Sequence, residues 1–444
     1  MKKFIRHYGE RRMMSSNKKS IELEKAIENK TARIAILGLG YVGLPLALAF
    51  AKKGFLTIGI DPDKTRINEI KRGKSYVNDI ADSEIKAQVN SKKLLPSVSF
   101  EKIKFADAII VCVPTPLNKT KDPDFSFVLD ATDAIAPRLR RGQMVIIEST
   151  IYPGMTTELI GPRLEQKTGL KPGRDFFLAM SPERIDPGNK KYQLKNTPKV
   201  VGGINPKSTR LASMLYQQII DRVIPVSSPT VAEMTKLLEN TFRQINIGLV
   251  NEIAIICDKL GINVLEVIDA ASTKPFGFMT FYPGPGTGGH CIPVDPIYLS
   301  WKMKSLNYRT RFIELATEIN AQMPEFWVNK TQEQLNRKGK ALCGARVLVI
   351  GVSYKKDIND LRESPALEIL KLLLDKGAKV QYHDPYIPRL ELEGKIIKSV
   401  KLSQSIVRNS DCVLIATDHS NINYQMLKST AKLIIDTRGV YHRL

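Results

Sequence analysis

The sequence is poor in the residues that build disulfide frameworks and metal clusters. Its 444 residues include five cysteines and five histidines. The cysteines (Cys112, Cys257, Cys291, Cys343 and Cys412) are scattered without a CxxC pair, and no histidine stands at metal-ligand spacing to another. An odd number of isolated cysteines argues against both a disulfide framework and a zinc cluster. We therefore expect a cytoplasmic protein without a bound metal.

Long uncharged segments are also scarce. Residues 34–51 (IAILGLGYVGLPLALAFA) carry no charge and follow a basic arm, so a membrane anchor has to be considered. This run contains three glycines and a proline in a phosphate-loop pattern, and a polar turn and a second strand-like run follow it. A strand, a loop and a helix explain more of the segment than an anchor does, and we expect no membrane association.

Positive charge is abundant, with a net charge of +22. The lysines and arginines are spread over the whole chain, and no nucleic-acid-binding motif accompanies them. This distribution favours a solvated surface that attracts small polyanions, such as nucleotide phosphates, over a nucleic-acid groove.

Short apolar runs alternate with segments of helical length from about residue 32. Five such runs read as buried strands: ARIAILG, FLTIGID, DAIIVCVP, QMVIIEST and DFFLAMSP. Parallel strands need crossover connections, so this order predicts a doubly wound parallel sheet. From Thr230 the apolar residues recur at helical spacing, and a second alternating region begins near Gly344.

The expected fold is thus α/β, with two Rossmann-like doubly wound parallel-sheet domains joined by a long helical spine that suits a dimer contact. The boundaries we expect are a basic N-terminal extension at 1–30, a dinucleotide-binding domain at 31–226, a central helical domain at 227–335 and a C-terminal domain at 336–444.

A glycine-rich loop follows the first expected strand. Gly38, Gly40 and Gly43 suit, in order, a tight turn, a close backbone approach to a pyrophosphate, and tight packing of helix on strand. Asp61 lies 18 residues past Gly43, where ribose hydroxyls bind in such folds. The acid favours NAD over NADP, although Arg66 nearby would suit a 2′-phosphate.

The segment PGPGTGGHCIPVDP places Cys291 after four glycines, beside His290 and four residues before Asp295. Free cysteines are usually buried hydrophobes, and Cys112 and Cys257 fit that reading, but a glycine-rich loop gives Cys291 backbone access. Cys291 is therefore the candidate nucleophile, while His290 reads as structural. Asp295 would lie one turn away if a helix begins there.

Other candidate polar groups stand on a helix or at strand ends. Lys236 and Asn240 are four residues apart and share a helix face, where they could steady an oxyanion or form ordinary solvated surface. Polar residues end two strands at the edge where doubly wound sheets bind ligands; they are Glu148, Ser149, Thr150, Glu183 and Arg184. Lys355 and Arg362 suit phosphate or sugar oxygens.

In order along the chain, GLGYVG, VPTPL, ESTIYPGMT, SPERIDPGN, AEMTKLLENT, PGPGTGGHCIPVDP and YKKDINDLRESP resemble the UDP-glucose/GDP-mannose dehydrogenase family. The resemblance runs from about residue 32 to 440 and is closest to the UDP-N-acetylglucosamine 6-dehydrogenase branch; the branch acting on UDP-N-acetylmannosamine is similar. It implies NAD-dependent oxidation of a sugar C6 alcohol to the carboxylate, through a thiohemiacetal and a thioester on Cys291, for surface polysaccharide synthesis.

The resemblance also implies a role for each matched residue. The catalytic positions are Cys291, Lys236, Asn240, Asp295, Thr150 and Glu183. The cofactor-binding positions are Gly38, Gly40, Tyr41, Val42, Gly43, Asp61, Arg66, Thr115 and Thr150. The UDP-sugar-binding positions are Arg184, Lys236, Gly288, Lys355 and Arg362, with Arg184 the candidate for recognising an acetamido group. The expected assembly is a homodimer or a higher homo-oligomer.

Two departures from the family pattern weaken UDP-glucose as the substrate. The UDP-glucose branch carries a glutamate where this chain has Pro187, and an arginine where it has Pro275. Two rival functions stay open: a single-step NAD-dependent hydroxyacid dehydrogenase, which needs no thiol, and a non-catalytic nucleotide or nucleic-acid binder.

Overall fold

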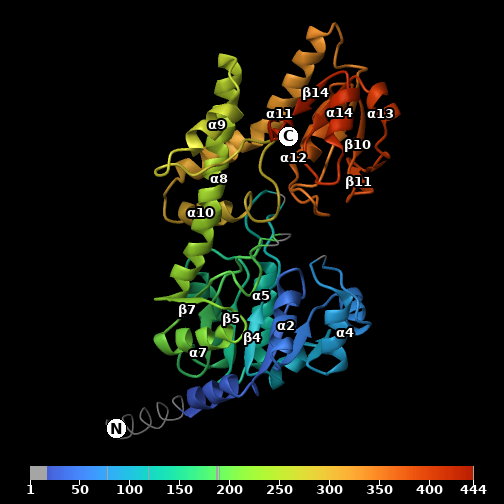
Figure 1. Ribbon diagram of the computed structural model, residues 1–444. Coiled ribbons are helices and arrows are strands. Elements are labelled where there is room, and N and C mark those ends of the chain that lie inside the picture. The colour runs from blue at the N-terminus through green and yellow to red at the C-terminus, as the bar shows by residue number, and fades with distance from the viewer. Residues whose placement is uncertain (1–17, 78, 119, 187–188, 190, 444) are drawn as a thin grey trace. The chain divides into compact units, whose positions relative to one another are not determined.

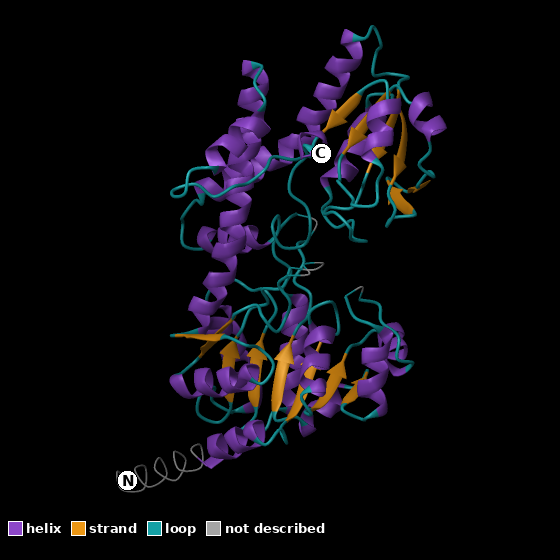
Figure 2. Ribbon diagram, viewed as in Figure 1, coloured by secondary structure: helices purple, strands orange, loops and turns teal. Residues whose placement is uncertain are grey.

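The computed structural model describes residues 18–77, 79–118, 120–186, 189 and 191–443. The chain divides into two compact units, Met1–Leu238 and Glu239–Leu444, and the division falls inside one long helix. Figure 1 labels several elements of each unit, and Figure 2 shows that each unit contains both strands and helices. The domain boundaries expected from the sequence stay a prediction.

The N-terminal unit is built on a sheet with the strand order β3-β2-β1-β4-β5-β6-β7-β8. All neighbours in this sheet pair in parallel except β6 and β7. Its strands are β1 (Arg33–Leu37), β2 (Leu56–Ile60), β3 (Leu94–Ser97), β4 (Ala108–Val111), β5 (Met144–Ile147), β6 (Phe177–Met180), β7 (Lys199–Gly203) and β8 (Val223–Val226). Its helices are α2 (Gly43–Lys52), α3 (Lys64–Lys71), α4 (Asp82–Asn90), η1 (Phe100–Phe105), α5 (Ser126–Ile135), η2 (Ala136–Arg138), η3 (Thr156–Ile160), α6 (Gly161–Thr168) and α7 (Pro206–Gln217).

The five expected strands of this unit are confirmed as β1, β2, β4, β5 and β6. In β4, β5 and β6 every residue is buried, because helices cover both faces of a parallel sheet. The sequence prediction missed β3, β7 and β8, of which β3 and β8 contain a proline and are partly exposed. Such edge strands lack the continuous apolar run that marks a central strand.

Residues 18–28, which we expected to belong to a polar extension, form a helix whose Leu23 and Ile27 lie in the core. This is a correction to that expectation. The two apolar residues are four positions apart and form a stripe too narrow to stand out among charged neighbours.

The helix α8 (Pro229–Leu260) confirms the expected spine and begins one residue before Thr230. Its second part belongs to the C-terminal unit, where it packs on α11 (Arg311–Arg337). A Cβ atom on Gly248 would lie 3.1 Å from the Cα of Ala316, so the helices approach closely. Asn251 donates from Nδ2 to Asn320 (2.8 Å) and accepts from the backbone N–H of Gly284 (2.9 Å), which ties the start of the glycine-rich loop to α8.

The C-terminal unit contains a parallel sheet with the strand order β10-β9-β13-β14 and a separate hairpin. Its strands are β9 (Arg346–Ile350), β10 (Lys379–His383), β11 (Arg389–Leu392), β12 (Lys395–Lys398), β13 (Cys412–Ile415) and β14 (Ile434–Asp436). Its other helices are α9 (Val264–Ser272), α10 (Asp295–Lys304), α12 (Pro365–Asp375), α13 (Gln404–Asn409), α14 (Tyr424–Thr430) and α15 (Val440–Arg443). The second alternating region, expected from about Gly344, is confirmed as this α/β unit, and the hairpin of β11 and β12 was not foreseen.

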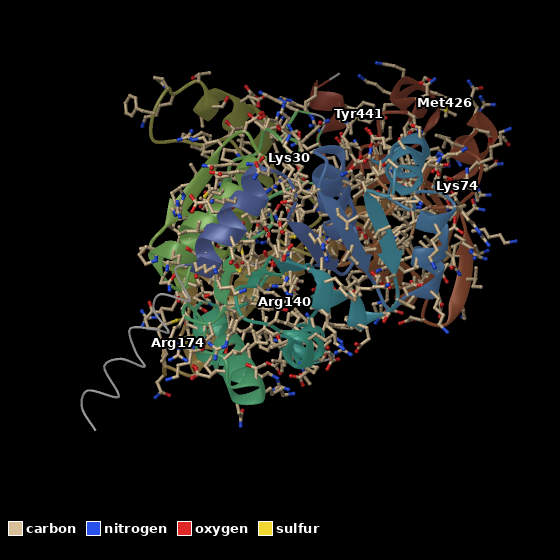
Figure 3. The ribbon with its side chains drawn as sticks, turned by 90° about the horizontal axis from the view of Figure 1, so that it is seen from below. Lys30, Lys74, Arg140, Arg174, Met426 and Tyr441 are labelled. Carbon is tan, nitrogen blue, oxygen red and sulfur yellow. The ribbon has the colours of Figure 1, made fainter. Side chains whose placement is uncertain are left out.

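Three basic side chains at separate places on the N-terminal unit have acidic partners. Figure 3 labels Lys74, Arg140 and Arg174 at separate places on this unit. They pair with Asp82 (2.7 Å), Asp107 (2.6 Å) and Asp175 (2.7 Å), respectively. The pair of Lys74 with Asp82 is exposed on both sides, and such pairs add little to stability. Among the helices that the structure describes, none has the length and apolar character required to cross a membrane.

The turn from β1 to α2 depends on two glycines. Gly38 has a φ of +87°, which favours glycine, and a Cβ atom there would lie 2.6 Å from the carbonyl oxygen of Cys112. A Cβ atom on Gly43 would lie 1.9 Å from the carbonyl oxygen of Gly38. Helix α2 can therefore pack on β1 only where residue 43 has no side chain.

We expect Gly43→Ala to lower the free energy of unfolding by about 2 kcal/mol or more, because backbone atoms would have to move. The matched control is Gly40→Ala, since a Cβ atom there meets nothing within 4 Å. Urea unfolding followed by circular dichroism would measure both variants. Equal unfolding midpoints for the two variants would contradict the packing role of Gly43.

Candidate active site

The loop after β1 leaves room for a ligand at one of its three glycines. Nothing lies within 4 Å of a Cβ atom built on Gly40, whereas such atoms on Gly38 and Gly43 would meet backbone. Tyr41 and Val42 form the turn that leads into α2, and Val42 is the N-cap residue. This backbone cradle fits a pyrophosphate beside the N-terminus of a helix.

Asp61, at the end of β2, is buried and supports this loop. Its Oδ2 accepts a hydrogen bond from the backbone N–H of Leu39 (2.8 Å), and its Oδ1 accepts one from that of Asp63 (2.9 Å). Arg66 donates to Asp61 (3.3 Å) and also pairs with Asp63 (3.5 Å). The arginine thus neutralises carboxylates here, and the acid stands at the position for a ribose diol, so this arrangement fits NAD.

Three expected polar residues follow adjacent strands of the same sheet. Thr115 comes after β4, Thr150 after β5 and Glu183 after β6. The strands pair in parallel with Val111 opposite Ile147 and Ile147 opposite Met180, so the residues leave the sheet at one edge. The hydroxyl of Ser149 donates to the carbonyl of Val113 (2.8 Å), which joins the first two loops. This carboxyl edge is where doubly wound sheets bind ligands.

A buried charge cluster lies directly below this edge, and the sequence prediction did not identify its centre. Lys199, in β7, is 3% exposed and forms ion pairs with Glu148 and with Glu183 (3.4 Å). Tyr216 donates from its hydroxyl to Glu148 (2.9 Å). A lysine within an apolar strand gives no sequence signal of its own, since its partners lie on other strands.

Two carboxylates share the Lys199 ammonium, and their pKa values move apart. Burial raises the pKa of Glu148 to about 7, although Lys199 opposes the shift. Burial also acts to raise the pKa of Glu183, but the Lys199 ammonium and further hydrogen bonds and charges, including Lys236, lower it overall. Glu183 is thereby held as the ionised member of the pair, while Glu148 can hold a proton near neutral pH.

Helix α8 presents two of the expected catalytic groups. Lys236 is buried, and its charge contributes to the lowered pKa of Glu183. One turn earlier, Glu233 accepts backbone hydrogen bonds from Gly154 and from Thr156 (3.0 Å), which hold the segment after Thr150 against α8. The ordinary solvated helix face that Lys236 could have formed is therefore not what the structure shows.

In the C-terminal unit, Cys291 is partly buried and directly precedes α10. A helix does begin at Asp295, as the spacing suggested, and the backbone N–H of Asp295 donates to the carbonyl of Cys291 (2.8 Å). The Asp295 carboxylate accepts a hydrogen bond from Nδ2 of Asn240. The structure thus brings together Cys291, Asp295 and Asn240, three of the expected catalytic residues.

The glycine-rich loop before Cys291 packs against the loop after β9. Cβ atoms on Gly288 and Gly289 would each lie 2.7 Å from side-chain atoms of Tyr354. The backbone N–H of Gly289 also donates to the carbonyl of Arg362 (2.9 Å). Side chains at these glycines would displace Tyr354, so the glycines serve packing as well as access. Tyr354 was not among the expected site residues.

The remaining expected substrate residues are found at loop positions. Arg362 is half exposed and forms a forked ion pair with Asp360 (2.6 Å at the shortest). Lys355 is partly buried in the same loop. Arg184, in the N-terminal unit, donates from Nη1 to the carbonyl of Pro198 (2.6 Å). Pro187, which replaces a glutamate of the UDP-glucose branch, lies outside the described residues.

The raised pKa of Glu148 predicts a pH-dependent stability. A carboxyl group whose folded pKa is raised from 4.5 to about 7 contributes stability that is present below the unfolded pKa and is lost as the pH rises through about 7. Glutamine does not titrate. We therefore expect the unfolding free energy of the wild type, relative to Glu148→Gln, to fall between about pH 5 and about pH 8.

Urea unfolding at both pH values would measure this difference. The control is Asp82→Asn, because Asp82 is exposed and its pKa is lowered from 3.8 by a hydrogen bond from Lys74, so it stays ionised throughout. A rise in the relative stability of the wild type between the two pH values would contradict the assignment to Glu148.

Comparison with known proteins agrees with this geometry. Three models of the UDP-glucose/GDP-mannose dehydrogenase family match the chain: the NAD binding domain at residues 32–220, the central domain at 230–322 and the UDP binding domain at 348–443. NAD is therefore the cofactor, and a UDP-sugar is the class of substrate.

Relatives that match over most of their length carry different substrate names. The chain is 36% identical to a UDP-N-acetyl-D-mannosamine dehydrogenase of Methanococcus vannielii, over 94% of this chain and 95% of that protein. It is 37% identical to a UDP-N-acetyl-D-glucosamine 6-dehydrogenase of Pseudomonas aeruginosa, over 81% and 84%. The solved structure of a UDP-D-ManNAc dehydrogenase from Pyrococcus horikoshii matches with a TM-score of 0.83 and 36% identity, covering 91% of this chain and 95% of that one. The chain belongs to the UDP-glucose/GDP-mannose dehydrogenase family and is an NAD-dependent UDP-sugar dehydrogenase.

Proposed function

We propose that the chain oxidises the C6 alcohol of a UDP-N-acetylhexosamine to the carboxylate, in two steps and through a covalent bond to Cys291. The observation that carries this proposal is the position of the thiol, which follows a glycine-rich loop and precedes the helix that presents Asp295 to Asn240. A single-step dehydrogenase has no use for this arrangement. The product would serve surface polysaccharide synthesis.

The chemistry needs the thiol at its second step. NAD, held by the glycine-rich loop after β1, would supply the hydride acceptor, with one molecule of NAD for each oxidation. The first oxidation would remove a hydride from C6 and the proton of its hydroxyl group. After the first oxidation, the sulfur of Cys291 adds to the carbon of the aldehyde, and the carbonyl oxygen takes a proton to give a thiohemiacetal. Loss of a second hydride and of that proton leaves a thioester. Water then adds to the carbonyl carbon, the C–S bond breaks, and the thiol leaves with a proton as the carboxylate forms.

Residues of this chain would handle the charge and the protons of these steps. Lys236 and Asn240, one turn apart on α8, would stabilise the developing oxyanion. Asp295 would exchange protons beside Cys291, while Thr150 and Glu183 would orient water. Lys199 supports this role, because its ammonium favours the ionised form of Glu183, a carboxylate able to accept a proton from water.

Two sugars are the leading substrates. The sequence motifs favour UDP-N-acetylglucosamine. The names of relatives that match over nearly the whole chain favour UDP-N-acetylmannosamine. Sequence identity does not separate them, since the two named relatives are 36% and 37% identical to this chain. UDP-glucose is the weaker alternative because of Pro187 and Pro275.

We propose further that the enzyme works as a homodimer or a higher homo-oligomer. In the C-terminal unit, α8 and α11 expose large apolar side chains to solvent; they are Phe242, Leu249, Ile256, Leu260, Phe312 and Leu315. Exposed apolar side chains in this number on neighbouring helices are typical of a subunit interface. A second copy of the chain would cover them.

The covalent route predicts two molecules of NADH for each molecule of sugar. The purified protein should produce this ratio, with a uronic acid product, from one or more of UDP-N-acetylglucosamine, UDP-N-acetylmannosamine, UDP-N-acetylgalactosamine and UDP-glucose. Absorbance of NADH and mass spectrometry of the product would measure it. Cys291→Ser should lower steady-state formation of the uronic acid by about a thousandfold, because it removes the nucleophile.

Cys343→Ser is the matched control, since Cys343 is exposed and lies elsewhere in the fold. Its activity should equal that of the wild type. One NADH per sugar would favour the single-step rival, and full activity of Cys291→Ser would remove the thioester route. Turnover of none of the four sugars would contradict the proposed substrate class.

Arg184 is proposed to recognise the acetamido group. Arg184→Ala should raise the KM for the acetamido sugars by about tenfold, the effect of one lost hydrogen bond to a charged donor, and should change that for UDP-glucose less. Steady-state kinetics with both sugar types would measure this, with Arg72→Ala, an exposed arginine, as the control. An equal rise for both sugar types would discard the assignment.

A further inference from the structure

Each of the two larger sheets has an aspartate that follows a strand and accepts a backbone N–H from a neighbouring loop. In the N-terminal sheet, Asp61 follows β2 and accepts the backbone N–H of Leu39 from the loop after β1. In the C-terminal sheet, Asp384 follows β10 and accepts the backbone N–H groups of Val352 (2.7 Å) and Ser353 (3.1 Å) from the loop after β9. Each acid therefore holds the loop that follows the neighbouring strand.

Asp384 differs from Asp61 in the number of its donors, because five groups of the protein donate to the Asp384 carboxylate and three donate to that of Asp61. Its side chain is fully buried, and its Oδ1 accepts the backbone N–H groups of Tyr386 (2.8 Å) and Ile387 (3.1 Å). Its Oδ2 also accepts from Nε2 of His419 (3.0 Å). Burial acts to raise its pKa, but His419 and these backbone donors lower it overall, so Asp384 stays ionised. These donors occupy the acceptor positions of the Asp384 carboxylate, so none is left for the hydroxyl groups of a ribose.

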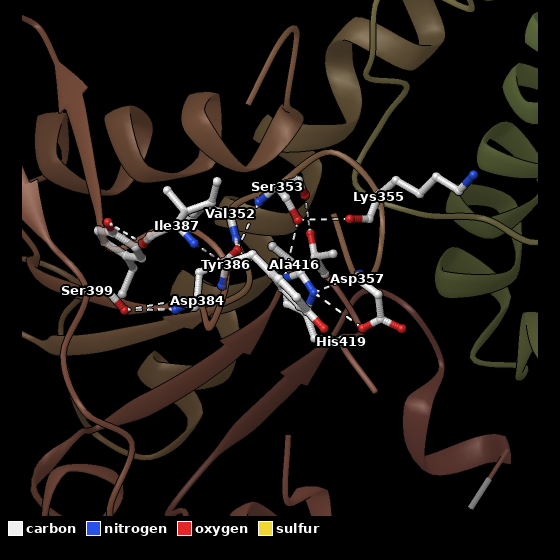
Figure 4. Close-up of polar contacts among 12 residues, drawn as sticks. Val352, Ser353, Lys355, Asp357, Asp384, Tyr386, Ile387, Ser399, Ala416 and His419 are labelled. Carbon is white, nitrogen blue, oxygen red and sulfur yellow. Dashed lines mark hydrogen bonds and ion pairs between the residues drawn. The ribbon is translucent and has the colours of Figure 1, made fainter. Parts of the chain in front are cut away.

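His419 has a defined tautomer in this network (Figure 4). Its ring is fully buried, and its Nδ1 lies 3.0 Å from the backbone nitrogen of Asp357. A backbone N–H can only donate, so Nδ1 accepts and the ring proton is on Nε2. Nε2 then donates to Asp384, with the hydroxyl of Ser353 at 3.3 Å. One neutral histidine thus links the buried acid to the loop.

The loop held by this histidine is a sharp turn that contains Lys355. Asp357 has a φ of +62°, in the left-handed region. The hydroxyl of Ser353 donates to the carbonyl of Lys355 (2.8 Å), and Ser420 donates to the Asp357 carboxylate from its backbone (2.8 Å) and its hydroxyl (2.6 Å). In Figure 4 the side chain of Lys355 extends away from these contacts. The network holds the backbone of Lys355, and the side chain of Lys355 points away from the network.

The same loop also contacts the segment before Cys291. Tyr354 packs against Gly288 and Gly289, and the carbonyl of Arg362 accepts the N–H of Gly289. Any displacement of the turn at residues 353–357 would therefore move both the substrate lysine and the packing partner of the cysteine loop.

We propose that His419 is a positioning residue for the UDP-sugar: bonded to Asp384 and Asp357, it holds the turn at residues 353–357 so that Lys355 and Tyr354 are correctly placed. This inference rests on the proposed function, in which Lys355 contacts the substrate. His419 itself touches no substrate. Asp61 stands at the position for a ribose in the first sheet. Asp384, at the corresponding position of the second sheet, anchors the loop that would bind the substrate.

Two substitutions separate the two hydrogen bonds of the ring. The amide oxygen of His419→Asn can replace Nδ1 and still accept from Asp357, whereas the amide nitrogen of His419→Gln can replace Nε2 and still donate to Asp384. Each variant loses one buried hydrogen bond, so both should lower the melting temperature by a similar amount. Only His419→Gln releases the turn directly. It should raise the KM for the UDP-sugar by about tenfold, with less change in kcat and none in the KM for NAD.

Hydrogen exchange measured by mass spectrometry gives a readout that does not depend on turnover. Residues 353–357 should exchange faster in His419→Gln than in His419→Asn or the wild type. Equal KM values and equal exchange in the two variants would overturn the proposal. If the wild type oxidises no UDP-sugar, the proposed function fails, while the exchange rates still decide whether His419 holds the turn.

A milder pair of variants guards against loss of folding. Ser420→Ala removes one hydrogen bond to Asp357 from an exposed residue, and it should raise the KM for the UDP-sugar by about two- to fivefold. Ser429→Ala removes an exposed hydroxyl bonded to Met426 in the same unit and should leave the KM unchanged. A Ser420→Ala enzyme with an unaltered KM and unaltered exchange in the turn would also count against the proposal.

Discussion

The first turn of α10 is the constraint on which the thiol chemistry depends. Asp295 donates its backbone N–H to the carbonyl of Cys291, and its carboxylate accepts from Asn240 of α8. These bonds join the cysteine loop to α8 through Asp295, which is the first residue of α10. A nucleophile must be held to within a fraction of an ångström of its productive position, and a loop rich in glycine cannot do this alone. Helices on both sides supply the rigidity that the loop lacks.

In both sheets an aspartate after one strand holds the loop after the neighbouring strand, but the two loops differ in the groups they carry. Asp61 and Asp384 each follow a parallel strand and each accept a backbone N–H from the neighbouring loop. At Asp61 the loop is a glycine cradle that fits a pyrophosphate. At Asp384 a buried histidine donates to the acid together with four backbone N–H groups, and the loop contains Lys355. The two aspartates share this local geometry. We infer that His419, which donates to Asp384, is what makes that acid unsuitable for binding a ribose.

At the carboxyl edge of the first sheet, too, neighbouring residues set the properties of an acidic side chain. Lys199 stands between Glu148 and Glu183, and one ammonium cannot neutralise two buried carboxylates equally. Burial therefore leaves Glu148 the weaker acid and Glu183 the stronger one. Opposite shifts in adjacent carboxyl groups are common where one group must hold a proton and the other must accept one.

Much of the fold was predictable because buried parallel strands are continuous apolar runs, and the central strands of both sheets were found from them. Edge strands such as β3 and β8, and the helix at residues 18–28, were missed because their burial is partial and their apolar stripes are narrow. Cys291 and the glycine loop were visible because glycine spacing is local. Lys199, Tyr354 and His419 were not, because each acquires its role from partners on other strands and loops.

The sequence by itself determined the central strands of both sheets, the dinucleotide loop and the candidate nucleophile, since each depends on residues close together in the chain. The tertiary structure alone decided which carboxylate keeps its proton, which glycines pack against Tyr354 and which acid is closed to a ribose. These properties arise from burial and from contacts between residues on different strands and loops, such as Lys199 with Glu148 and His419 with Asp384. Desolvation and pairing act only once the chain has folded.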